Sequence, residues 1–289
     1  MKTRNFWRFS TSALFVITIL LSASWSFAQV IDQSIDQTIE IIDPSVTNPD
    51  YDSQKLARHN LFRSTNSSSE IDAAQNTSVE RPKPAAAMTK ATSACFIPID
   101  ASYTVLPRND DGSFGPIALP FTFDLYGSSY TQVWINTNGN LTFTGPLATF
   151  SASGFPFGTP MVAPFWGDVD TRNTQGGQIH YKLSATNLIV TWDNVGYYNQ
   201  QVDKLNEFQV VISDGVDPIT GLGQNVCFNY GDMQWTTGSA SSGVNGFGGV
   251  PATVGVNKGN SVDFYQLGRF NVNSAVYDGP GGNPDGINY

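Results

Sequence analysis

The most constraining feature of this sequence is a series of short apolar segments, each followed by turn-forming residues. From Cys95 onward these segments recur at intervals of about 8 to 15 residues, and no stretch has the period of a long helix. The chain contains 27 glycines and 16 prolines, which supply many turns. We therefore predict an all-β fold: a two-sheet antiparallel sandwich of about ten strands or more, with a closed barrel as the alternative.

Two local patterns support this prediction. Residues 117–125 alternate, and the apolar members share one face of a strand: Leu119, Phe121, Phe123 and Leu125. Asn138-Gly139 lies between two strand-like segments and predicts a tight hairpin, because both residues tolerate positive φ.

Three segments place a tryptophan close to an aspartate. They are PMVAPFWGDVDTR (Pro160–Arg172), LIVTWDNVGYY (Leu188–Tyr198) and CFNYGDMQWTT (Cys227–Thr237). A buried indole N–H needs an acceptor, which a carboxylate or a carbonyl at a strand end provides. We interpret these segments as corners of the core, with a ligand or metal rim as the alternative.

Residues 1–28 have the pattern of a secretory signal peptide. Lys2, Arg4 and Arg8 precede the apolar run Ala13–Leu21, and Ser26–Ala28 matches a cleavage site. The run is too short to span a bilayer stably, and an uncleaved anchor is the alternative. We expect a secreted chain with no transmembrane segment after cleavage.

The mature chain would be strongly acidic. The leader contains three basic and no acidic residues, so the formal net charge of −9 becomes −12 without it. Such a surface repels phosphate backbones, so we expect no nucleic-acid partner.

Residues 29–94 do not resemble a packed domain. They are rich in small polar residues, proline and alanine, with weak helical patterns at Val30–Asp43 and Ser53–Arg63. Few large apolar groups are present to offset the entropy of ordering. We predict a flexible or weakly helical tether here, followed by one domain over residues 95–289.

The chain contains two cysteines, Cys95 and Cys227. In an oxidising compartment such a pair commonly forms a disulfide, which we predict; two free buried thiols are the alternative.

The ordered segments MVAPFWGDVDTR, GGQIHYKLS, LIVTWDNVGYY, DKLNEFQVVISDG, FNYGDMQWTTG and ATVGVNKGN together resemble the nidogen-like extracellular domain. The resemblance covers about Ser102–Tyr289. It implies an extracellular β-rich module linked to cell–matrix adhesion, with no enzymatic activity. We therefore expect a secreted module that contacts a matrix protein, a cell-surface protein or a glycan, with a lectin-like carbohydrate-binding sandwich as the alternative.

The residues of the predicted domain do not form a catalytic set. The segment 95–289 contains one histidine, His180, in the middle of a strand, and one glutamate, Glu207. It contains no G-x-S-x-G nucleophile motif. A serine hydrolase needs a base beside its nucleophile, and a Glu/Glu glycosidase pair is excluded. An acid–base pair of Asp168 and Asp170, two residues apart on one strand, is the remaining hydrolase alternative. We predict that the chain is not an enzyme.

One loop has the residues of a calcium site. Asp168, Asp170 and Asn173 offer hard oxygen ligands at close spacing, which suits Ca²⁺. Alternatively, Arg172 forms an ion pair with one of these aspartates. Asn109–Asp111 and Asp214/Asp217 are weaker candidates for such a site, and we interpret them as parts of solvated turns.

A contact surface is predicted from aromatic residues near loops. Tyr197 and Tyr198 precede a polar segment, and Phe247 lies in the glycine-rich loop Gly238–Gly249. Exposed aromatic residues on loops favour recognition, and packing of the tyrosines in the core is the alternative.

Overall fold

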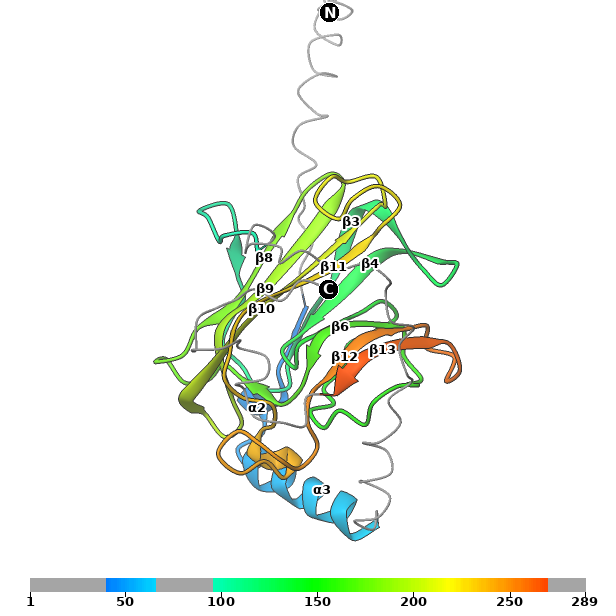
Figure 1. The fold of residues 1–289 in the computed structure, drawn as a ribbon. Helices are drawn as coiled ribbons and strands as arrows, with labels where there is room; N and C mark the ends of the chain where they lie inside the picture. The colour runs from blue at the N-terminus through cyan, green and yellow to red at the C-terminus, as the bar shows by residue number, and fades with distance from the viewer. Residues whose placement is uncertain (1–39, 66–95, 270–289) are drawn as a thin grey trace, which may run out of the picture. The chain divides into compact units, whose positions relative to one another are not determined.

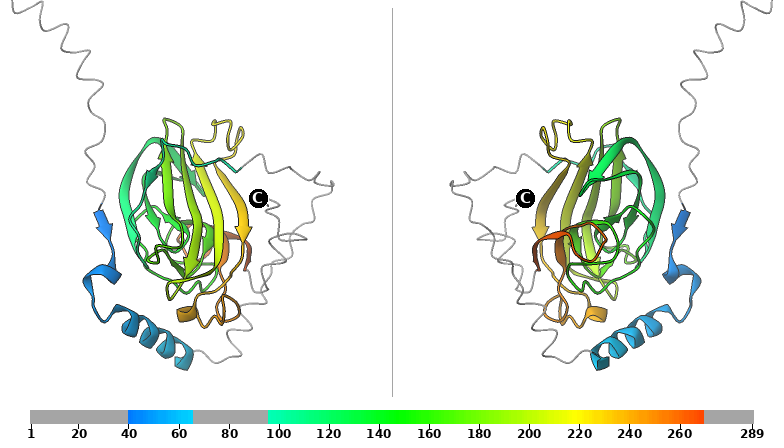
Figure 2. Two further views of the ribbon diagram at one scale, coloured as in Figure 1. Left: turned by 90° about the vertical axis from the view of Figure 1, so that its left-hand side faces the viewer. Right: turned by 90° about the vertical axis from the view of Figure 1, so that its right-hand side faces the viewer.

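The computed structural model describes residues 40–65 and 96–269 (Figure 1). All of them belong to one compact unit, Ile39–Tyr289. Two antiparallel sheets dominate it, and little helix is present. The predicted two-sheet sandwich is confirmed, and the two layers are visible edge-on in Figure 2.

The first sheet contains seven strands. In spatial order they are β1 (Glu40–Ile42), β3 (Ser113–Leu125), β4 (Ser128–Asn136), β5 (Asn140–Thr142), β6 (Met161–Trp166), β12 (Thr253–Asn257) and β13 (Phe264–Arg269). Neighbouring strands pair antiparallel, and the first strand, β1, comes from the region before the predicted domain.

The second sheet contains six strands. Five follow the order β11 (Val226–Met233), β10 (Gln201–Ser213), β9 (Asn187–Tyr197), β8 (Gln178–Leu183) and β2 (Thr104–Val105), and β7 (Val169–Asp170) pairs with the far end of β9. Register shifts in β10 between Gln201 and Phe208 mark an irregularity beside that end.

The described helices are α2 (Pro44–Thr47), α3 (Tyr51–Thr65) and the 3₁₀ turn η1 (Ser239–Ser241). Asp43 caps α2 by accepting a hydrogen bond from the Ser45 backbone N–H at 2.9 Å. Within the described ranges no helix has both the length and the apolar character needed to cross a membrane.

The helical pattern predicted in the N-terminal extension at Ser53–Arg63 is confirmed, because these residues lie within α3, but residues 40–65 do not form a flexible tether. These residues form β1, α2 and α3, and β1 pairs with β3, with Ile41 opposite Phe114. The rest of the predicted tether and the predicted signal peptide lie outside the described residues. Composition did not predict that this segment is ordered, because its main contacts to the sandwich are made by polar side chains, which are described below.

The core lies between the sheets, and the alternation predicted for residues 117–125 is confirmed. Their apolar side chains are buried while Ala118, Thr122 and Asp124 are exposed. The hairpin at Asn138-Gly139 is also confirmed: β4 and β5 pair across it, and Gly139 has φ +73°. An added Cβ there would overlap the Phe165 carbonyl, so the turn requires glycine.

The three tryptophans from the quoted segments are fully buried in or beside this core. Their indole N–H groups donate to backbone carbonyls rather than to the nearby aspartates. The bonds are Trp166 to Thr149 O (2.9 Å), Trp192 to Thr137 O (3.0 Å) and Trp235 to Val195 O (3.0 Å). The interpretation of these tryptophans as core corners is therefore confirmed, and the aspartates are left for other contacts.

Candidate functional site

A buried cluster of charged side chains joins α3 to one end of the sandwich. We call Lys55, Asp110, Asp111 and Asp168 the lysine cluster. Lys55 comes from α3, the two adjacent aspartates precede β3, and Asp168 lies between β6 and β7. An isolated antiparallel bridge between Asp110 and Asp170 holds two of the contributing loops together. Figure 1 shows α3, in blue, at this end of the strands.

The Lys55 ammonium is surrounded by carboxylate oxygens. Its Nζ lies 2.9 and 3.0 Å from the two oxygens of Asp110, 3.0 Å from Asp111 Oδ1 and 2.7 Å from Asp168 Oδ1. The lysine side chain is 0% exposed, and the three aspartate side chains are at most 3% exposed. Three N–H donors thus meet four oxygens, a geometry that fixes the ammonium in one place.

Aromatic rings complete the enclosure of this ammonium. Nζ lies 4.2 Å from the ring centroid of Tyr198 and 4.4 Å from that of Phe150. Tyr51, one turn before Lys55 on α3, donates its hydroxyl proton to Asp111 Oδ2. Ring faces attract a cation, and more strongly where water is excluded. The pocket is therefore built for a positive charge on both its polar and its aromatic side.

A second ion pair lies beside the cluster and also involves α3. Arg172 donates to Asp170 at 2.6 and 2.9 Å and to Asp52 of α3 at 3.1 Å, and it lies 3.3 Å from Asp110 Oδ2. The Tyr198 hydroxyl donates to the Asp52 backbone carbonyl at 3.2 Å. The helix is thus attached to the sandwich through two positions three residues apart: Asp52 pairs with Arg172, and Lys55 pairs with the three aspartates.

Burial and charge shift the titration of these groups. Burial raises the pKa of Asp168 to about 7, although Lys55 acts in the opposite direction. Burial likewise raises the pKa of Asp110 well above its ordinary value. For Lys55, burial disfavours the charged form, but Asp110, Asp168 and Asp111 outweigh it, so its pKa rises and the ammonium stays charged. Three aspartates therefore surround a single ammonium, and burial disfavours the charged form of Asp110 and Asp168.

The cluster is tightly enclosed by its neighbours. Asn138 donates to Asp111 Oδ1 at 2.7 Å, whereas its own Oδ1 and Asp168 Oδ2 accept no hydrogen bond from the described residues. A Cβ on Gly238 would overlap the Asp168 carboxylate, so that position accepts only glycine without movement. The charged side chains of the cluster are thus held away from solvent, an arrangement suited to attaching α3 to the sandwich.

The predicted calcium ligands do not converge in the structure. Asp168 contacts Lys55, while Asp170 binds Arg172 and accepts from the Gln200 N–H at 2.9 Å. Asn173 donates to the Gln200 carbonyl at 2.9 Å. The alternative ion pair with Arg172 is what the structure shows for Asp170, because the guanidinium takes both of its oxygens.

The aspartates that do converge with Asp168 are Asp110 and Asp111, whose interpretation as parts of a solvated turn is wrong. They are 0% and 3% exposed. Three carboxylates, Asp110, Asp111 and Asp168, lie close enough together to hold a metal ion, but the Lys55 ammonium occupies their centre. The sequence signal that was missed is Lys55 itself, the one cation whose helix brings it to this turn.

The predicted aromatic contact surface is wrong for its two tyrosines. Tyr197 and Tyr198 are 2% and 0% exposed, and Tyr198 lines the lysine cluster. Phe247 is half-buried, with Lys204 Nζ 6.0 Å from its ring centroid. His180 lies on β8, as predicted, with Nε2 3.7 Å from Asp193 Oδ2. The alternative, core packing of the tyrosines, is what the structure shows.

The predicted Cys95–Cys227 disulfide stays a prediction, because Cys95 lies outside the residues that the structure describes. Cys227 is half-buried on β11 and packs against a small apolar cluster that also contacts Ile97. Ile97 is fixed there by two hydrogen bonds with the Gln209 side chain, at 3.1 and 2.9 Å. Ile97 and Cys227 therefore pack against the same apolar cluster.

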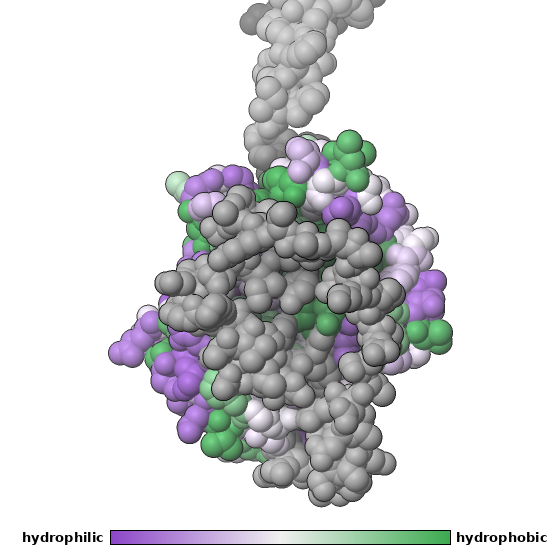
Figure 3. All heavy atoms as spheres, viewed as in Figure 1, coloured by the Kyte–Doolittle hydropathy of each residue, from purple (hydrophilic) through white to green (hydrophobic). Residues whose placement is uncertain are grey.

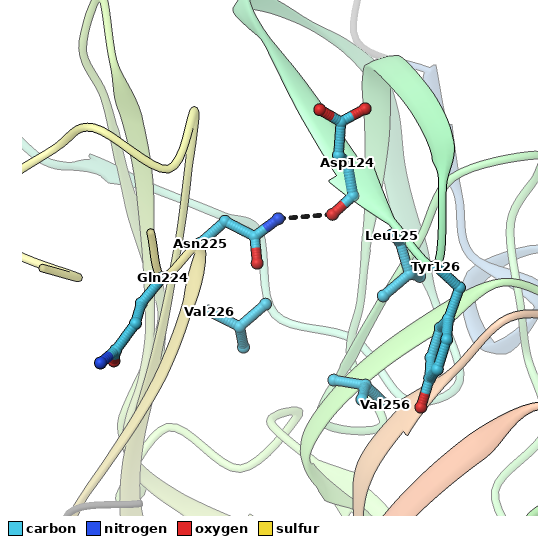
Figure 4. A pocket seen from close by; sticks show the side chains of 7 residues that line it. All are labelled: Asp124, Leu125, Tyr126, Gln224, Asn225, Val226 and Val256. Atoms are coloured by element: carbon cyan, nitrogen blue, oxygen red, sulfur yellow. Dashed lines mark hydrogen bonds between the residues drawn. The ribbon is translucent and has the colours of Figure 1, made fainter. Parts of the chain in front are cut away.

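A second feature lies at the opposite end of β3 from the lysine cluster. There, the β3–β4 turn and the β10–β11 loop (residues 214–225) border an open groove of about 360 Å³ (Figure 4). It is lined by Asp124, Leu125, Tyr126, Gln224, Asn225, Val226 and Val256. The Asn225 amide donates to the Asp124 carbonyl across it, as the dashed line in Figure 4 shows.

The β10–β11 loop exposes aliphatic side chains beside this groove. Val216, Ile219 and Leu222 are 64%, 45% and 83% exposed. Figure 3 shows hydrophobic side chains at this upper end of the molecule. We call these three residues the apolar loop. Exposed apolar groups gathered on one loop are typical of interaction surfaces.

Comparison with known proteins gives one family. The model of the family described as "NIDO related" matches residues 87–277. Alpha-tectorin of Homo sapiens is 35% identical over 195 residues, which cover 57% of this chain and 9% of alpha-tectorin. Alpha-tectorin of Gallus gallus is 33% identical over 205 residues, covering 60% of this chain and 9% of that protein.

Nidogen of Drosophila melanogaster is 28% identical over 137 residues, covering 38% of this chain and 10% of nidogen. The match thus spans about a tenth of the length of each of these relatives. No solved structure matches the chain. The matched residues include the three aspartates of the lysine cluster, whereas Lys55 precedes the matched region.

Proposed function

Because this chain belongs to the NIDO-related family, we propose that it is a secreted, non-catalytic module that mediates contact with a matrix or cell-surface protein, in the manner of cell–matrix adhesion. The protein is extracellular, as its relatives alpha-tectorin and nidogen are. Within the proposal, residues 1–28 direct export and are removed. The proposal concerns the module; the activities of the much longer relatives are not transferred to it.

The observation that supports a contact function is the apolar loop. Val216, Ile219 and Leu222 project from one end of the sandwich, where a partner's apolar surface can cover them. Burial of apolar area contributes about 25 cal/mol per Å², so three aliphatic side chains supply a substantial part of a weak protein contact. In contrast, the charged side chains of the lysine cluster are at most 3% exposed, so the cluster offers a substrate no access.

A replacement of the loop side chains tests the proposal. The triple variant Val216→Ser, Ile219→Ser, Leu222→Ser should lose binding to immobilised matrix proteins in a solid-phase assay and keep its melting temperature. Val262→Ser, at another turn where valine is 70% exposed, is the matched control and should bind normally. Unchanged binding by the triple variant would contradict the proposal.

The alternative, a carbohydrate-binding sandwich, is favoured by the groove next to the loop. Its lining combines an aromatic ring, Tyr126, with the polar side chains of Asp124, Gln224 and Asn225, a combination that suits a saccharide. A glycan array separates the two functions. Saccharide binding that Tyr126→Ala abolishes, without any binding to matrix proteins, would replace protein contact by lectin function.

A further inference from the structure

Residues 40–65 contact the sandwich as a separate piece of chain. The first contact is the pairing of β1 with the edge of β3, and the others are the insertion of Lys55 between three aspartates and the pairing of Asp52 with Arg172. Thirty residues, 66–95, separate this piece from the rest of the sandwich. The family match begins at residue 87, so the piece lies before the matched residues, whereas the three aspartates of the pocket lie within them.

Among the side chains of this piece that the structure describes, the buried ones are Tyr51 and Lys55. Tyr51 and Lys55 are 3% and 0% exposed, while Ile41, Ile42 and Leu56 are between 39% and 50% exposed. None of the described apolar clusters between and around the sheets includes a residue of this piece. Its departure would therefore uncover the pocket of the lysine cluster and the edge of β3.

The pocket left behind would strongly favour being filled. It contains three carboxylates and the rings of Tyr198 and Phe150, which all face one ammonium position. Without a cation, three buried acidic groups would repel one another and lose their hydrogen-bond donors. Beside the pocket, the edge of β3 accepts a short strand. Together they recognise a strand followed by a lysine-bearing helix.

We propose that the pocket accepts this piece from a second copy of the chain, so that molecules associate by exchanging residues 40–65. The contacts would be the same within one molecule and between two, which is why such exchange is a low-energy route to dimers. Thirty residues can span at most about 100 Å when extended, enough to reach a neighbouring molecule. The length of the 66–95 segment and the protein concentration then set the balance between molecules that keep residues 40–65 in their own pocket and molecules that exchange them. The inference does not depend on the apolar loop.

Cysteine trapping tests the exchange without disturbing the cluster. Ile42 lies directly opposite Ser113 in the β1–β3 register, so cysteines at these positions can form a disulfide. Full-length Ile42→Cys chains are mixed with full-length Ser113→Cys chains under oxidising conditions. We expect a disulfide-linked heterodimer in which mass spectrometry finds the 42–113 cross-link. The double variant Ile42→Cys, Ser113→Cys, which closes the bond within one chain, verifies the geometry and the fold.

The role of Lys55 is tested in the same mixture. Adding Lys55→Met to the Ile42→Cys chain should lower the yield of heterodimer at least tenfold, whereas Lys258→Met, at a surface ion pair, should leave it unchanged. Absence of the intermolecular cross-link, while the double variant closes its own, would overturn the proposal. So would equal yields with and without Lys55.

A peptide provides a second measurement. A synthetic peptide of residues 40–65 should bind full-length Lys55→Met protein, whose own piece brings no ammonium to the carboxylates, and the same peptide with methionine at position 55 should bind at least tenfold more weakly. Equal binding by the two peptides, or no binding by either, would contradict a transferable lysine site.

Discussion

Replacement of Lys55 by methionine should lower the stability of the protein in a pH-dependent way. Methionine has a similar length but no charge, so the three carboxylates lose their ammonium while the helix keeps its packing. Removing one partner of a buried ion pair typically costs about 3–5 kcal/mol. Lys55 is completely buried and contacts three carboxylates, so we expect a loss in this range at pH 7.5.

The pH dependence follows from the raised pKa values of the carboxyls. Keeping a carboxyl protonated in the folded state lowers the free energy of unfolding by about 1.4 kcal/mol for each pH unit above its unfolded pKa of about 3.9. This cost is about 5 kcal/mol at pH 7.5 and about 1.5 kcal/mol at pH 5. Burial already raises the pKa of Asp168 to about 7 with Lys55 present. When the pKa of a carboxyl is higher in the folded state than in the unfolded state, its contribution to the free energy of unfolding is fully present below the unfolded pKa. This contribution is lost as pH rises through the folded pKa. The variant should therefore recover most of its loss at pH 5.

Urea denaturation followed by tryptophan fluorescence measures this loss, because Trp166, Trp192 and Trp235 are all buried in the sandwich. Undocking of α3 would return the carboxylates to water and limit the global loss, so hydrogen exchange of the α3 amides is measured in parallel and should be faster in the variant. Lys182→Met, at an exposed ion pair, is the control and should have little effect. Equal stability at pH 7.5, with unchanged exchange in α3, would refute the reasoning.

Three further predictions concern the surroundings of the cluster. Gly238→Ala should destabilise the protein by about 1–3 kcal/mol in urea, because the added methyl group overlaps the Asp168 carboxylate; a neutral effect would contradict this packing. Mass spectrometry without reductant should find Cys95 linked to Cys227, a bond that closes a long loop and contributes at most about 4–5 kcal/mol, whereas two free thiols would remove it. Ca²⁺ should give neither heat nor a shift in melting temperature with the wild-type chain, because Lys55 already occupies the carboxylates; a shift abolished by Asp168→Ala would show that calcium displaces it.

The sandwich could be predicted from sequence because its signals are local. Alternation in β3 and the positive φ of Gly139 each involve neighbouring residues, and both appear directly in the residue pattern. The tryptophan corners were also recognisable, since a buried indole needs an acceptor. The residue pattern does not distinguish a backbone carbonyl from a carboxylate as that acceptor. In the structure all three indole N–H groups donate to backbone carbonyls.

The lysine cluster could not be predicted because its partners are distant in sequence and polar in type. Lys55 lies 55 residues before Asp110, in a helix whose apolar residues do not form a strong stripe. An Asn-Asp-Asp-Gly sequence has the composition of a solvated turn, and only the arrival of a lysine and a tyrosine from α3 makes it a buried site. Tyr198 was similarly ambiguous, since an aromatic residue next to a loop can face either solvent or a cation.

Competitive labelling of lysines tests the central claim, that Lys55 is enclosed by the sandwich, most directly. The native protein is treated with a trace of acetylating reagent, and mass spectrometry compares Lys55 with Lys182, Lys204 and Lys258, which are partly exposed in surface ion pairs. We expect Lys55 to be labelled at least tenfold more slowly than these three in the native state and equally fast in urea. Labelling of Lys55 at the rate of the surface lysines in the native protein would contradict the account.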